Sequence, residues 1–364
     1  MNPQIRIDRE FHFATVFDSD TGAYVRSGVY KNGKDTGVDP FRAAFPHLVD
    51  VGIMGSCAHG KKGFCRDAGV GCYQKGAEIE QANMTLEDFT EIVLQCKGKV
   101  DQFALGGRGD PNLHENFAEI LKLCRNHGIV PNFTTSGYGL TQEAVALCKQ
   151  YCGAVAVSWY RNKYTAHAIE ILLAAEVKTN IHYVLGANTI DEAIERLLHN
   201  GFPKGINAVI FLLHKPVGLG NAEHVLSIQD SRMKRFFEIM DAGNTPYKFG
   251  IDSCTTPGVI TSCSQVDIAS VDTCEGGRFS CYISSDMKMV PCSFDQAREY
   301  AVSLREHTIK QAWESPAFAR FRDILNEACP DCKERAVCLG GCPLLPSIVL
   351  CDEKKNREVH KHEQ

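Results

Sequence analysis

The chain has 364 residues, of which 44% are hydrophobic and 23% are charged, and its formal net charge is −5. This composition is typical of a globular protein large enough for more than one domain, and the negative charge excludes a general nucleic-acid binder. No apolar run is long enough to cross a bilayer, and residues 1–13 lack the apolar stretch of a secretory signal. We therefore expect a cytoplasmic protein that binds neither nucleic acid nor membrane.

Residues 1–46 predict an extended, hairpin-like lead-in, because the apolar run Phe11–Val16 is followed by turn-forming residues 18–22. From residue 47 to residue 250, short apolar runs alternate with amphipathic stretches. The predicted strands are Leu48–Met54, Val100–Leu105, Ile129–Thr135, Ala154–Trp159, Val177–Leu185 and Ala208–Leu213. The predicted helices are Thr85–Gln95, Glu115–Asn126, Gln142–Tyr151, Thr165–Ala175 and Ile190–Leu198.

This alternation favours an α/β fold with a parallel sheet and helices outside it. Six strands are too few for the closed eight-stranded barrel, so we predict a partial (β/α)6 TIM-like barrel over residues 47–250. Residues 251–351 lack the alternation and are rich in cysteine, which indicates a small separate domain. The charged tail, residues 352–364, is expected to be solvated.

The chain contains 17 cysteines. An odd count in a long chain without an export signal argues against a disulfide scaffold. Four cysteines lie beside Leu and Val in helix-like segments, and we expect them to be small buried hydrophobic residues: Cys96, Cys124, Cys148 and Cys152.

The C-terminal cysteines are clustered and predict metal chemistry. Cys329, Cys332, Cys338 and Cys342 form the pattern C-x2-C-x5-C-x3-C, and Cys351 follows. Further cysteines precede this motif at positions 274, 281 and 292. Thiolates at these spacings can converge on an iron–sulfur cluster, and the motif by itself could equally form one structural zinc site.

Polar and glycine-rich motifs follow the first four predicted strands, where βα folds collect their functional residues. After the first strand, Cys57, Cys65 and Cys72 could supply three thiolates to a four-iron cluster and leave one iron open. After the second strand, Gly106-Gly107-Arg108-Gly109-Asp110 combines flexible backbone with a carboxylate that can take a charged amine. Residues 134–137 and 158–160 follow the next two strands, although each such motif alone is also typical of a plain turn.

Taken in order, these motifs resemble the radical S-adenosylmethionine (SAM) enzymes with a C-terminal SPASM-type auxiliary iron–sulfur domain, of the kind that modify peptides and proteins. The resemblance spans about residues 48–351. It implies SAM and three [4Fe–4S] clusters, one of them held by the three cysteines that follow the first strand. Two departures stand out: the cysteine loop is C-x7-C-x6-C rather than C-x3-C-x2-C, and the acidic residue of the glycine motif is Asp110 rather than Glu.

The resemblance also implies the residues that contact SAM. They are Tyr73, Gly106, Gly107, Asp110, Ser136, Ser158 and His182. Alternation along the fifth strand puts Asn180 and His182 on one face. His182 could also be a hydrogen-bonded core residue, and His59 is interpreted as polar loop content.

By the same resemblance, the C-terminal cysteines hold two auxiliary clusters. The outer cluster would be bound by Cys329, Cys332, Cys338 and Cys351. The inner cluster would be bound by Cys274, Cys281, Cys292 and Cys342, with Cys254 or Cys263 as alternatives to Cys281. In sulfatase-maturing relatives an acidic base follows the Pro-Cys cysteine. Ser293 stands there, so Asp295 becomes the candidate base.

The implied activity is reductive cleavage of SAM to a 5′-deoxyadenosyl radical, which takes hydrogen from a peptide or protein side chain. Such an oxidoreductase or maturase would receive electrons from a flavodoxin or ferredoxin. The lead-in is too short for a winged-helix recognition domain, which favours a separate recognition protein. The alternatives are a small-molecule dehydrogenase or mutase, and a non-catalytic electron-transfer or zinc-binding protein.

Overall fold

A ten-stranded sheet runs through the computed structural model, which describes residues 3–245 and 247–352. The strand order is β12-β11-β10-β9-β8-β7-β6-β13-β14-β15. The strands of the barrel are parallel: β6 (Leu48–Met54), β7 (Gln102–Gly107), β8 (Val130–Thr135), β9 (Val155–Ser158), β10 (Thr179–Leu185), β11 (Ala208–Leu213) and β12 (Lys248–Ile251). The prediction of a partial α/β barrel is confirmed.

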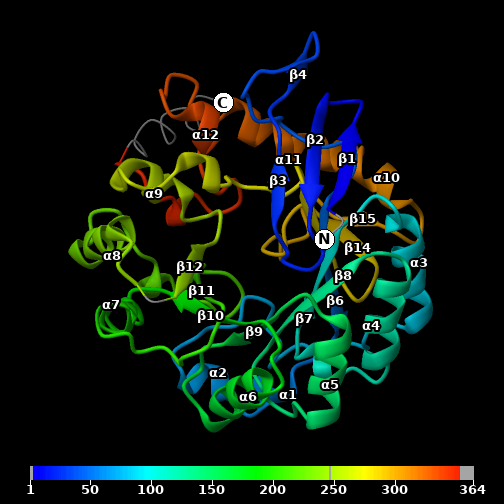
Figure 1. Cartoon of the computed structure of the whole chain (residues 1–364), viewed down its shortest axis with the longest axis vertical. Coiled ribbons are helices and arrows are strands. Elements are labelled where there is room, and N and C mark those ends of the chain that lie inside the picture. The colour runs from blue at the N-terminus through cyan, green and yellow to red at the C-terminus, as the bar shows by residue number, and fades with distance from the viewer. Residues whose placement is uncertain (1–2, 246, 353–364) are drawn as a thin grey trace.

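Six helices cover the outer face of this curved sheet (Figure 1). They are α3 (Leu86–Cys96), α4 (Phe117–Asn126), α5 (Gln142–Tyr151), α6 (Lys163–Ala174), α7 (Ile190–Leu198) and α8 (Ser231–Ala242). Side-chain caps fix where several of them begin, as at Thr85, Thr141 and Asn162. Their buried faces include Cys96, Cys124 and Cys148, which confirms the packing role predicted for these three.

Strand alternation separates the two faces of the barrel. In β6, Val49, Val51 and Ile53 are fully buried beneath the helices. Asp50 and Gly52 lie on the opposite face, because successive residues of a strand point to opposite sides. This inner face positions the functional side chains.

The C-terminal part continues the barrel sheet instead of forming a detached unit. Its strand β13 (Ser280–Ile283) pairs in parallel with β6, Ser280 opposite Leu48. Strands β14 (Lys288–Val290) and β15 (Val302–Ser303) then add in antiparallel fashion. The helices of this part are α9 (Thr256–Ser262), α10 (Ile309–Trp313), α11 (Pro316–Glu327) and α12 (Arg335–Cys338). One sheet therefore joins the barrel to the cysteine-rich region.

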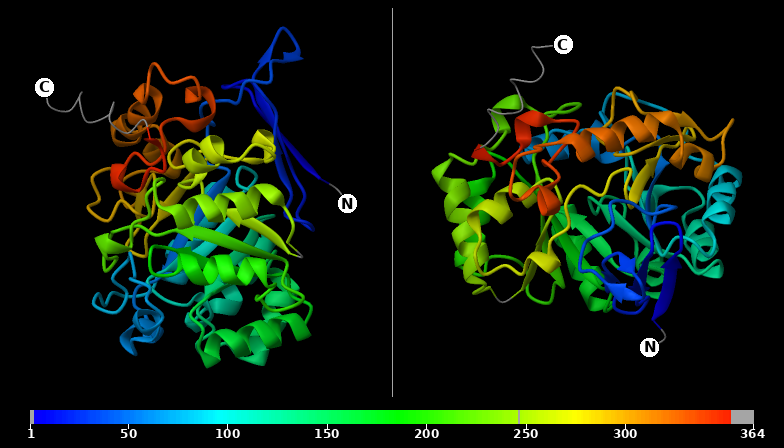
Figure 2. Two further views of the ribbon diagram at one scale, coloured as in Figure 1. Left: turned by 90° about the vertical axis from the view of Figure 1, so that its left-hand side faces the viewer. Right: turned by 90° about the horizontal axis from the view of Figure 1, so that it is seen from above.

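The N-terminal segment packs against this C-terminal part. It forms a three-stranded antiparallel sheet of β1 (Gln4–Asp8), β2 (Phe13–Phe17) and β3 (Tyr24–Arg26), followed by the small hairpin β4 (Tyr30–Lys31) and β5 (Lys34–Asp35). Figure 2 shows these strands along one edge of the molecule. Arg26 fastens them there, because its guanidinium binds Asp39, Asp272 and Glu275 and lies 3.9 Å from the centre of the Phe279 ring.

Within the described residues, no helix combines the length and the apolar character that crossing a bilayer requires. Of the predicted charged tail, all but Asp352 lies outside the described residues.

Candidate functional site

The cysteine loop after β6 folds into two short helices, α1 (Ala58–Lys61) and α2 (Phe64–Asp67). Cys57 caps α1, and its Sγ accepts a hydrogen bond from the Gly60 amide at 3.0 Å. Cys65 lies within α2, and Cys72 Sγ accepts from the Gly76 amide at 3.4 Å. The two helices accommodate the additional residues of this longer loop.

The three thiols of the loop lie near one another and near Asp110. Burial, with the charges of Asp110, Cys72 and Cys65, raises the pKa of Cys57 to about 12, and the hydrogen bond from the Gly60 amide acts to lower it. Burial and the Cys72 thiol likewise raise the pKa of Cys65. Buried thiols that lie close together can ionise where a metal cation compensates the charge of the thiolates. The two amide hydrogen bonds to sulfur are suited to cysteines that ligate a cluster. The donor set therefore fits an iron–sulfur cluster.

An aromatic group packs against the cysteine loop. His59 stacks on Tyr160 with ring centroids 5.0 Å apart, and Phe64 packs on Tyr164 at 5.3 Å. Burial lowers the pKa of His59 to about 4, so its ring is neutral at physiological pH. These contacts give His59 a packing role that residue type alone did not reveal.

Asp110 and Ser136, two of the predicted SAM contacts, bind one another directly. The Ser136 hydroxyl donates to Asp110 Oδ2 at 2.8 Å, and Thr135 Oγ1 donates to Oδ1 at 3.2 Å. Burial raises the pKa of Asp110, and the hydrogen bonds from Ser136 and Thr135 oppose that effect. The carboxylate is thus oriented before any ligand arrives.

The two glycines of the adjacent motif have different roles. Gly107 has φ of +108°, and a Cβ there would lie 2.5 Å from the Met54 carbonyl oxygen, so only glycine fits. A Cβ on Gly106 would meet nothing within 4 Å. The backbone at Gly106 therefore borders open space that a ligand could use.

Ser158 and His182 lie opposite one another in the register of β9 and β10. His182 Nδ1 is 3.2 Å from Thr134 Oγ1, and burial lowers the pKa of His182 to about 4. The neutral imidazole and these hydroxyls lie on the inner face of neighbouring strands. Asn180 on the same face is bound by Asn207 at 2.8 Å.

Tyr73 extends from the cysteine loop towards the C-terminal region. Its ring stacks on Phe294 with centroids 4.2 Å apart, and its hydroxyl accepts a hydrogen bond from Gln74 Nε2 at 3.0 Å. The resemblance predicts a place near adenine for this residue. In the structure, its ring contacts the segment that follows Cys292.

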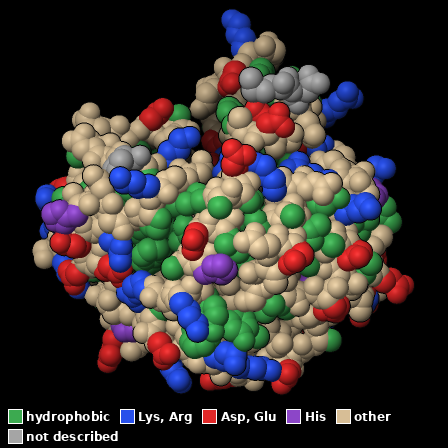
Figure 3. All heavy atoms as spheres, turned by 60° about the horizontal axis from the view of Figure 1, so that its bottom comes forward, with side chains coloured by type: hydrophobic (Ala, Val, Ile, Leu, Met, Phe, Trp, Pro, Cys, Tyr) green, Lys and Arg blue, Asp and Glu red, His purple; other side chains and the backbone are tan. Residues whose placement is uncertain are grey.

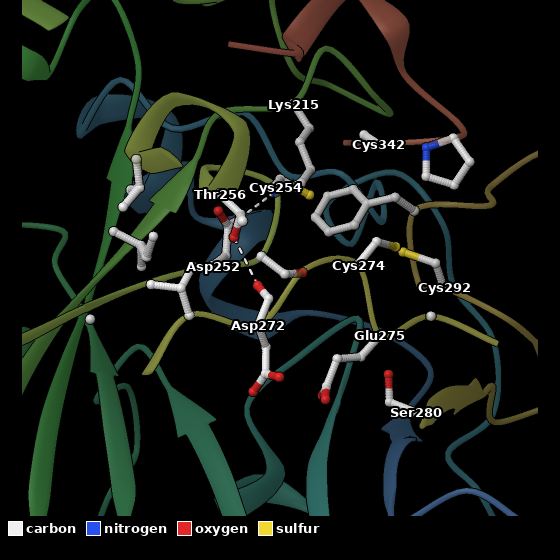
Figure 4. A pocket seen from close by; sticks show the side chains of 18 of the residues that line it. Lys215, Asp252, Cys254, Thr256, Asp272, Cys274, Glu275, Ser280, Cys292 and Cys342 are labelled. Carbon is white, nitrogen blue, oxygen red and sulfur yellow. Dashed lines mark hydrogen bonds and ion pairs between the residues drawn. The ribbon is translucent and has the colours of Figure 1, made fainter. Parts of the chain in front are cut away.

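Five cysteines of the C-terminal part border one cavity of about 670 Å³ (Figure 4). They are Cys254, Cys274, Cys281, Cys292 and Cys342. Cys274 and Cys292 are free thiols that point towards one another. A hydrogen bond with Cys342 and burial raise the pKa of Cys254, and burial and the Cys254 thiol raise the pKa of Cys274. Burial and the thiols of Cys274 and Cys254 raise the pKa of Cys292, so four of the five thiols interact with one another.

Cys281 is buried on β13 and borders the same cavity. Burial raises its pKa, and the other groups that act on it among the described residues are Cys96, Asp50 and Arg322, not the other inner cysteines. Cys263 does not line the cavity, and its Sγ lies 3.8 Å from the Phe237 carbonyl oxygen. Of the three candidates for the fourth inner position, Cys254 is therefore the one whose thiol interacts with the other inner cysteines.

The cysteines of the predicted outer set lie in tight turns near the end of the chain. The Cys332 amide donates to the Cys329 carbonyl at 3.1 Å, and Cys338 ends α12. Thr273 Oγ1 donates to the Cys338 carbonyl at 2.6 Å, which ties this turn to the residue before Cys274. Cys351 is half-buried and directly precedes Asp352, the last described residue. The hydrogen bond from Thr273 to Cys338 thus links the inner and the outer cysteine groups.

The structure gives Asp295 a structural contact network. Its two carboxylate oxygens accept the amides of Glu299 at 3.0 Å and Tyr300 at 2.9 Å. The prediction that Asp295 is a catalytic base rests on its sequence position alone. The two hydrogen bonds show that its carboxylate stabilises the turn after Cys292.

The sequence interpretation missed the charged residues of the cavity, among them Asp50, Lys215 and Asp252. Lys215 Nζ donates to Asp252 Oδ2 at 2.5 Å and lies 4.6 Å from the centre of the Phe294 ring. Burial alone would lower the pKa of Lys215, but Asp252 and Cys254 raise it. One signal was visible: Asp50 is the single charged residue of an otherwise apolar strand.

The barrel face that carries α1, α2 and α6 has hydrophobic side chains gathered among lysine, arginine and acidic residues (Figure 3).

Among residues 3–245 and 247–352, no three or more His, Cys, Asp or Glu side chains are arranged to hold a single metal ion. Thiolates bound to one zinc lie about 2.3 Å from it, whereas a four-iron cluster spreads its ligands over several corners.

Comparisons with known proteins agree with this architecture. Residues 274–333 match the family model of SPASM, an iron–sulfur cluster-binding domain. No curated protein sequence matches the chain.

Three solved structures share the fold. SuiB from Streptococcus suis, solved with S-adenosylmethionine, is 17% identical with a TM-score of 0.64, over 83% of this chain and 74% of SuiB. SuiB bound to its precursor peptide SuiA is 16% identical with the same TM-score, over 83% of this chain and 72% of that one. The protein anSMEcpe, with AdoMet and the Cp18Cys peptide, is 17% identical with a TM-score of 0.59, over 87% and 95%. The predicted resemblance is therefore confirmed for the fold and for the cysteine-rich part: the chain has the fold of these structures, and its residues 274–333 match the SPASM domain.

Proposed function

We propose that this protein is a radical SAM enzyme that cleaves SAM reductively and abstracts hydrogen from a peptide or protein side chain. The observation that carries the proposal is the gathering of Cys57, Cys65 and Cys72 beside the oriented carboxylate of Asp110. Three thiols leave one corner of a four-iron cluster without a protein ligand, and a carboxylate next to that corner can take a charged amine.

When bound, such a cluster supplies the electron that converts SAM to a 5′-deoxyadenosyl radical. The chain's own residues bind and orient. Asp110 would receive the amino group of SAM, with Ser136 and Thr135 fixing its direction. Gly106 leaves the room beside it, and Ser158 and His182 offer polar atoms on neighbouring strands.

The ligand sets of the auxiliary clusters follow from the cysteine placement. For the inner cluster we assign Cys254, Cys274, Cys292 and Cys342, because the thiols of these four interact with one another, whereas Cys281 borders the same cavity without acting on them. For the outer cluster we retain Cys329, Cys332, Cys338 and Cys351. With the SAM cluster, the protein would hold three [4Fe–4S] clusters, reduced by a flavodoxin or ferredoxin.

A peptide or protein substrate is supported by the structural relatives. SuiB was solved with its precursor peptide SuiA and anSMEcpe with the Cp18Cys peptide, and both share this fold. The cavity beside the inner cysteines is within the size range of sites that take small molecules or single side chains.

Anaerobic reconstitution followed by measurement of 5′-deoxyadenosine tests the proposal. Wild-type protein should bind about twelve iron atoms per chain and form 5′-deoxyadenosine from SAM and dithionite. The triple variant Cys57→Ala/Cys65→Ala/Cys72→Ala should lose about four iron atoms and all product. Cys152→Ala, outside both cysteine groups, is the matched control and should retain both. Product formation by the triple variant would refute the proposed reaction.

A further inference from the structure

The inner face of β6 places one carboxylate in the cavity that the inner cysteines border. Asp50 points away from the fully buried Val49 and Val51 and lines this cavity together with Phe249–Ile251 of β12 and Ser280 of β13. The strands β6 and β12 are the two ends of the barrel's own set of strands. The cavity therefore occupies the gap where the partial barrel does not close.

Asp50 lacks a compensating partner. Among the described residues, its carboxylate has neither a hydrogen bond nor an ion pair, and burial together with the charge of Glu275 raises its pKa to about 7. Two other carboxylates do have partners, because Lys215 binds Asp252 and Ser136 binds Asp110. A half-buried carboxyl without a donor is costly to the fold, which suggests that a ligand supplies the missing partner.

The carboxylates near Asp50 outnumber the cations that face them. Asp272 and Glu275 also border the cavity, and both bind Arg26, which Asp39 shares. Arg278 also binds Asp39, at 3.5 Å. Among the residues that the structure describes, the one lysine that lines the cavity, Lys215, is bound to Asp252. This leaves a region of negative potential around Asp50.

Two carboxylates of the cavity lie apart from two of its thiols. In Figure 4 the carboxylates of Asp272 and Glu275 lie on one side, away from Cys254 and Cys342. A cluster held by the cysteines would therefore leave the acidic side free. This side is large enough to be shared with a substrate group, because the whole cavity measures about 670 Å³.

We propose that the acidic side of this cavity is a subsite for a positively charged group of the substrate, an ammonium or guanidinium side chain, which pairs with Asp50. This inference rests on the proposed function and names the chemistry of its substrate. A cation here forms a charge-assisted hydrogen bond with Asp50, whereas a neutral side chain leaves the carboxylate unpaired.

Binding to the reconstituted holoenzyme tests the proposal without requiring turnover. The probes are the N-acetyl methylamides of lysine and arginine and their uncharged counterparts, norleucine and citrulline, measured by anaerobic isothermal titration calorimetry. Each cationic probe should bind roughly tenfold more tightly than its neutral counterpart. Asp50→Asn should abolish this preference, and Asp50→Glu should retain part of it. Asp191→Asn, which changes a carboxylate that is 75% exposed and bound to Arg232, should leave it unchanged.

Two results would overturn the subsite: equal binding of lysine and norleucine to the wild type, or a preference that survives in Asp50→Asn. The first needs no variant, so a folding defect cannot obscure it, and iron content and the melting curve establish that Asp50→Asn is folded. Formation of 5′-deoxyadenosine by the wild type is measured in the same preparation. Absence of that product refutes the proposed function, whereas its presence without a charge preference refutes the subsite alone.

Discussion

The ring of Tyr73 stacks on the ring of Phe294, with centroids 4.2 Å apart and an interplanar angle of 30°. Tyr73 directly follows Cys72 of the cysteine loop, and Phe294 lies two residues after Cys292 of the inner cysteine group. A hydrogen bond with Ser293 acts to lower the pKa of Tyr73 against the stronger effect of burial, which raises it. One aromatic pair thus joins the loops that carry ligands of two proposed clusters.

This stack predicts energetic coupling between the two loops. Tyr73→Leu and Phe294→Leu should each lower the free energy of unfolding, and the double variant should lose less than the two single losses combined. The coupling energy should be about 1 kcal/mol, the range of a buried aromatic pair. Anaerobic urea unfolding of the two single variants and the double variant measures it. Strictly additive losses would show that the contact does not stabilise the protein.

Much of the barrel could be predicted from the sequence because its strands are short apolar runs and its helices are amphipathic. The bounds of β6, β11, α5 and α7 coincide with their predictions. Strand β12 was missed because Lys248–Ile251 contains glycine and is not a continuous apolar run. Helix α8 was also missed, although Asp230 caps it and Gly243 ends it with φ of +64°.

The site was predictable in its residue types and not in its long-range contacts. Thiol spacing marks cluster ligands within one segment, but the choice between Cys254 and Cys281 depends on how the C-terminal part packs on the barrel. Pairing of β13 with β6 determines which groups surround Cys281, and no local sequence pattern encodes that pairing. For the same reason, Asp50 and Lys215 come to line one cavity only after folding.

The cysteine placement predicts different results for two single substitutions. Cys254→Ala should remove a ligand of the inner cluster and lower the iron content by up to about four atoms per chain. Cys281→Ala should leave the iron content unchanged and cost about 1 kcal/mol of stability, because it removes one buried sulfur from the core. Iron analysis and electron paramagnetic resonance of the reduced proteins distinguish them. Loss of a cluster signal in Cys281→Ala, with Cys254→Ala intact, would reverse the assignment.

Arg26 predicts how strongly the N-terminal sheet is held to the C-terminal part. Its side chain is 7% exposed and contacts three carboxylates, so Arg26→Met should leave Glu275 without its cation. We expect a loss of about 3 kcal/mol in the free energy of unfolding, as for one partner removed from a buried ion pair. Arg232→Met, in which a 36% exposed side chain loses its two carboxylate partners, is the control and should cost under about 1 kcal/mol. If both variants lose the same free energy of unfolding, Arg26 does not hold the N-terminal sheet more strongly than an exposed ion pair would.

The bond between Ser136 and Asp110 predicts a pH dependence of SAM binding. Only the ionised carboxylate pairs with the amino group of SAM, so affinity should fall as the pH drops through the pKa of Asp110. Burial raises that pKa and the Ser136 hydrogen bonds lower it. Ser136→Ala removes the hydroxyl donor, so the pKa should rise and affinity should begin to fall at a higher pH than in the wild type. Asp110→Asn should bind SAM at least about tenfold more weakly and without this titration. Calorimetric titrations with SAM across a pH series measure both effects. A midpoint that does not move in Ser136→Ala would mean that another group controls the titration.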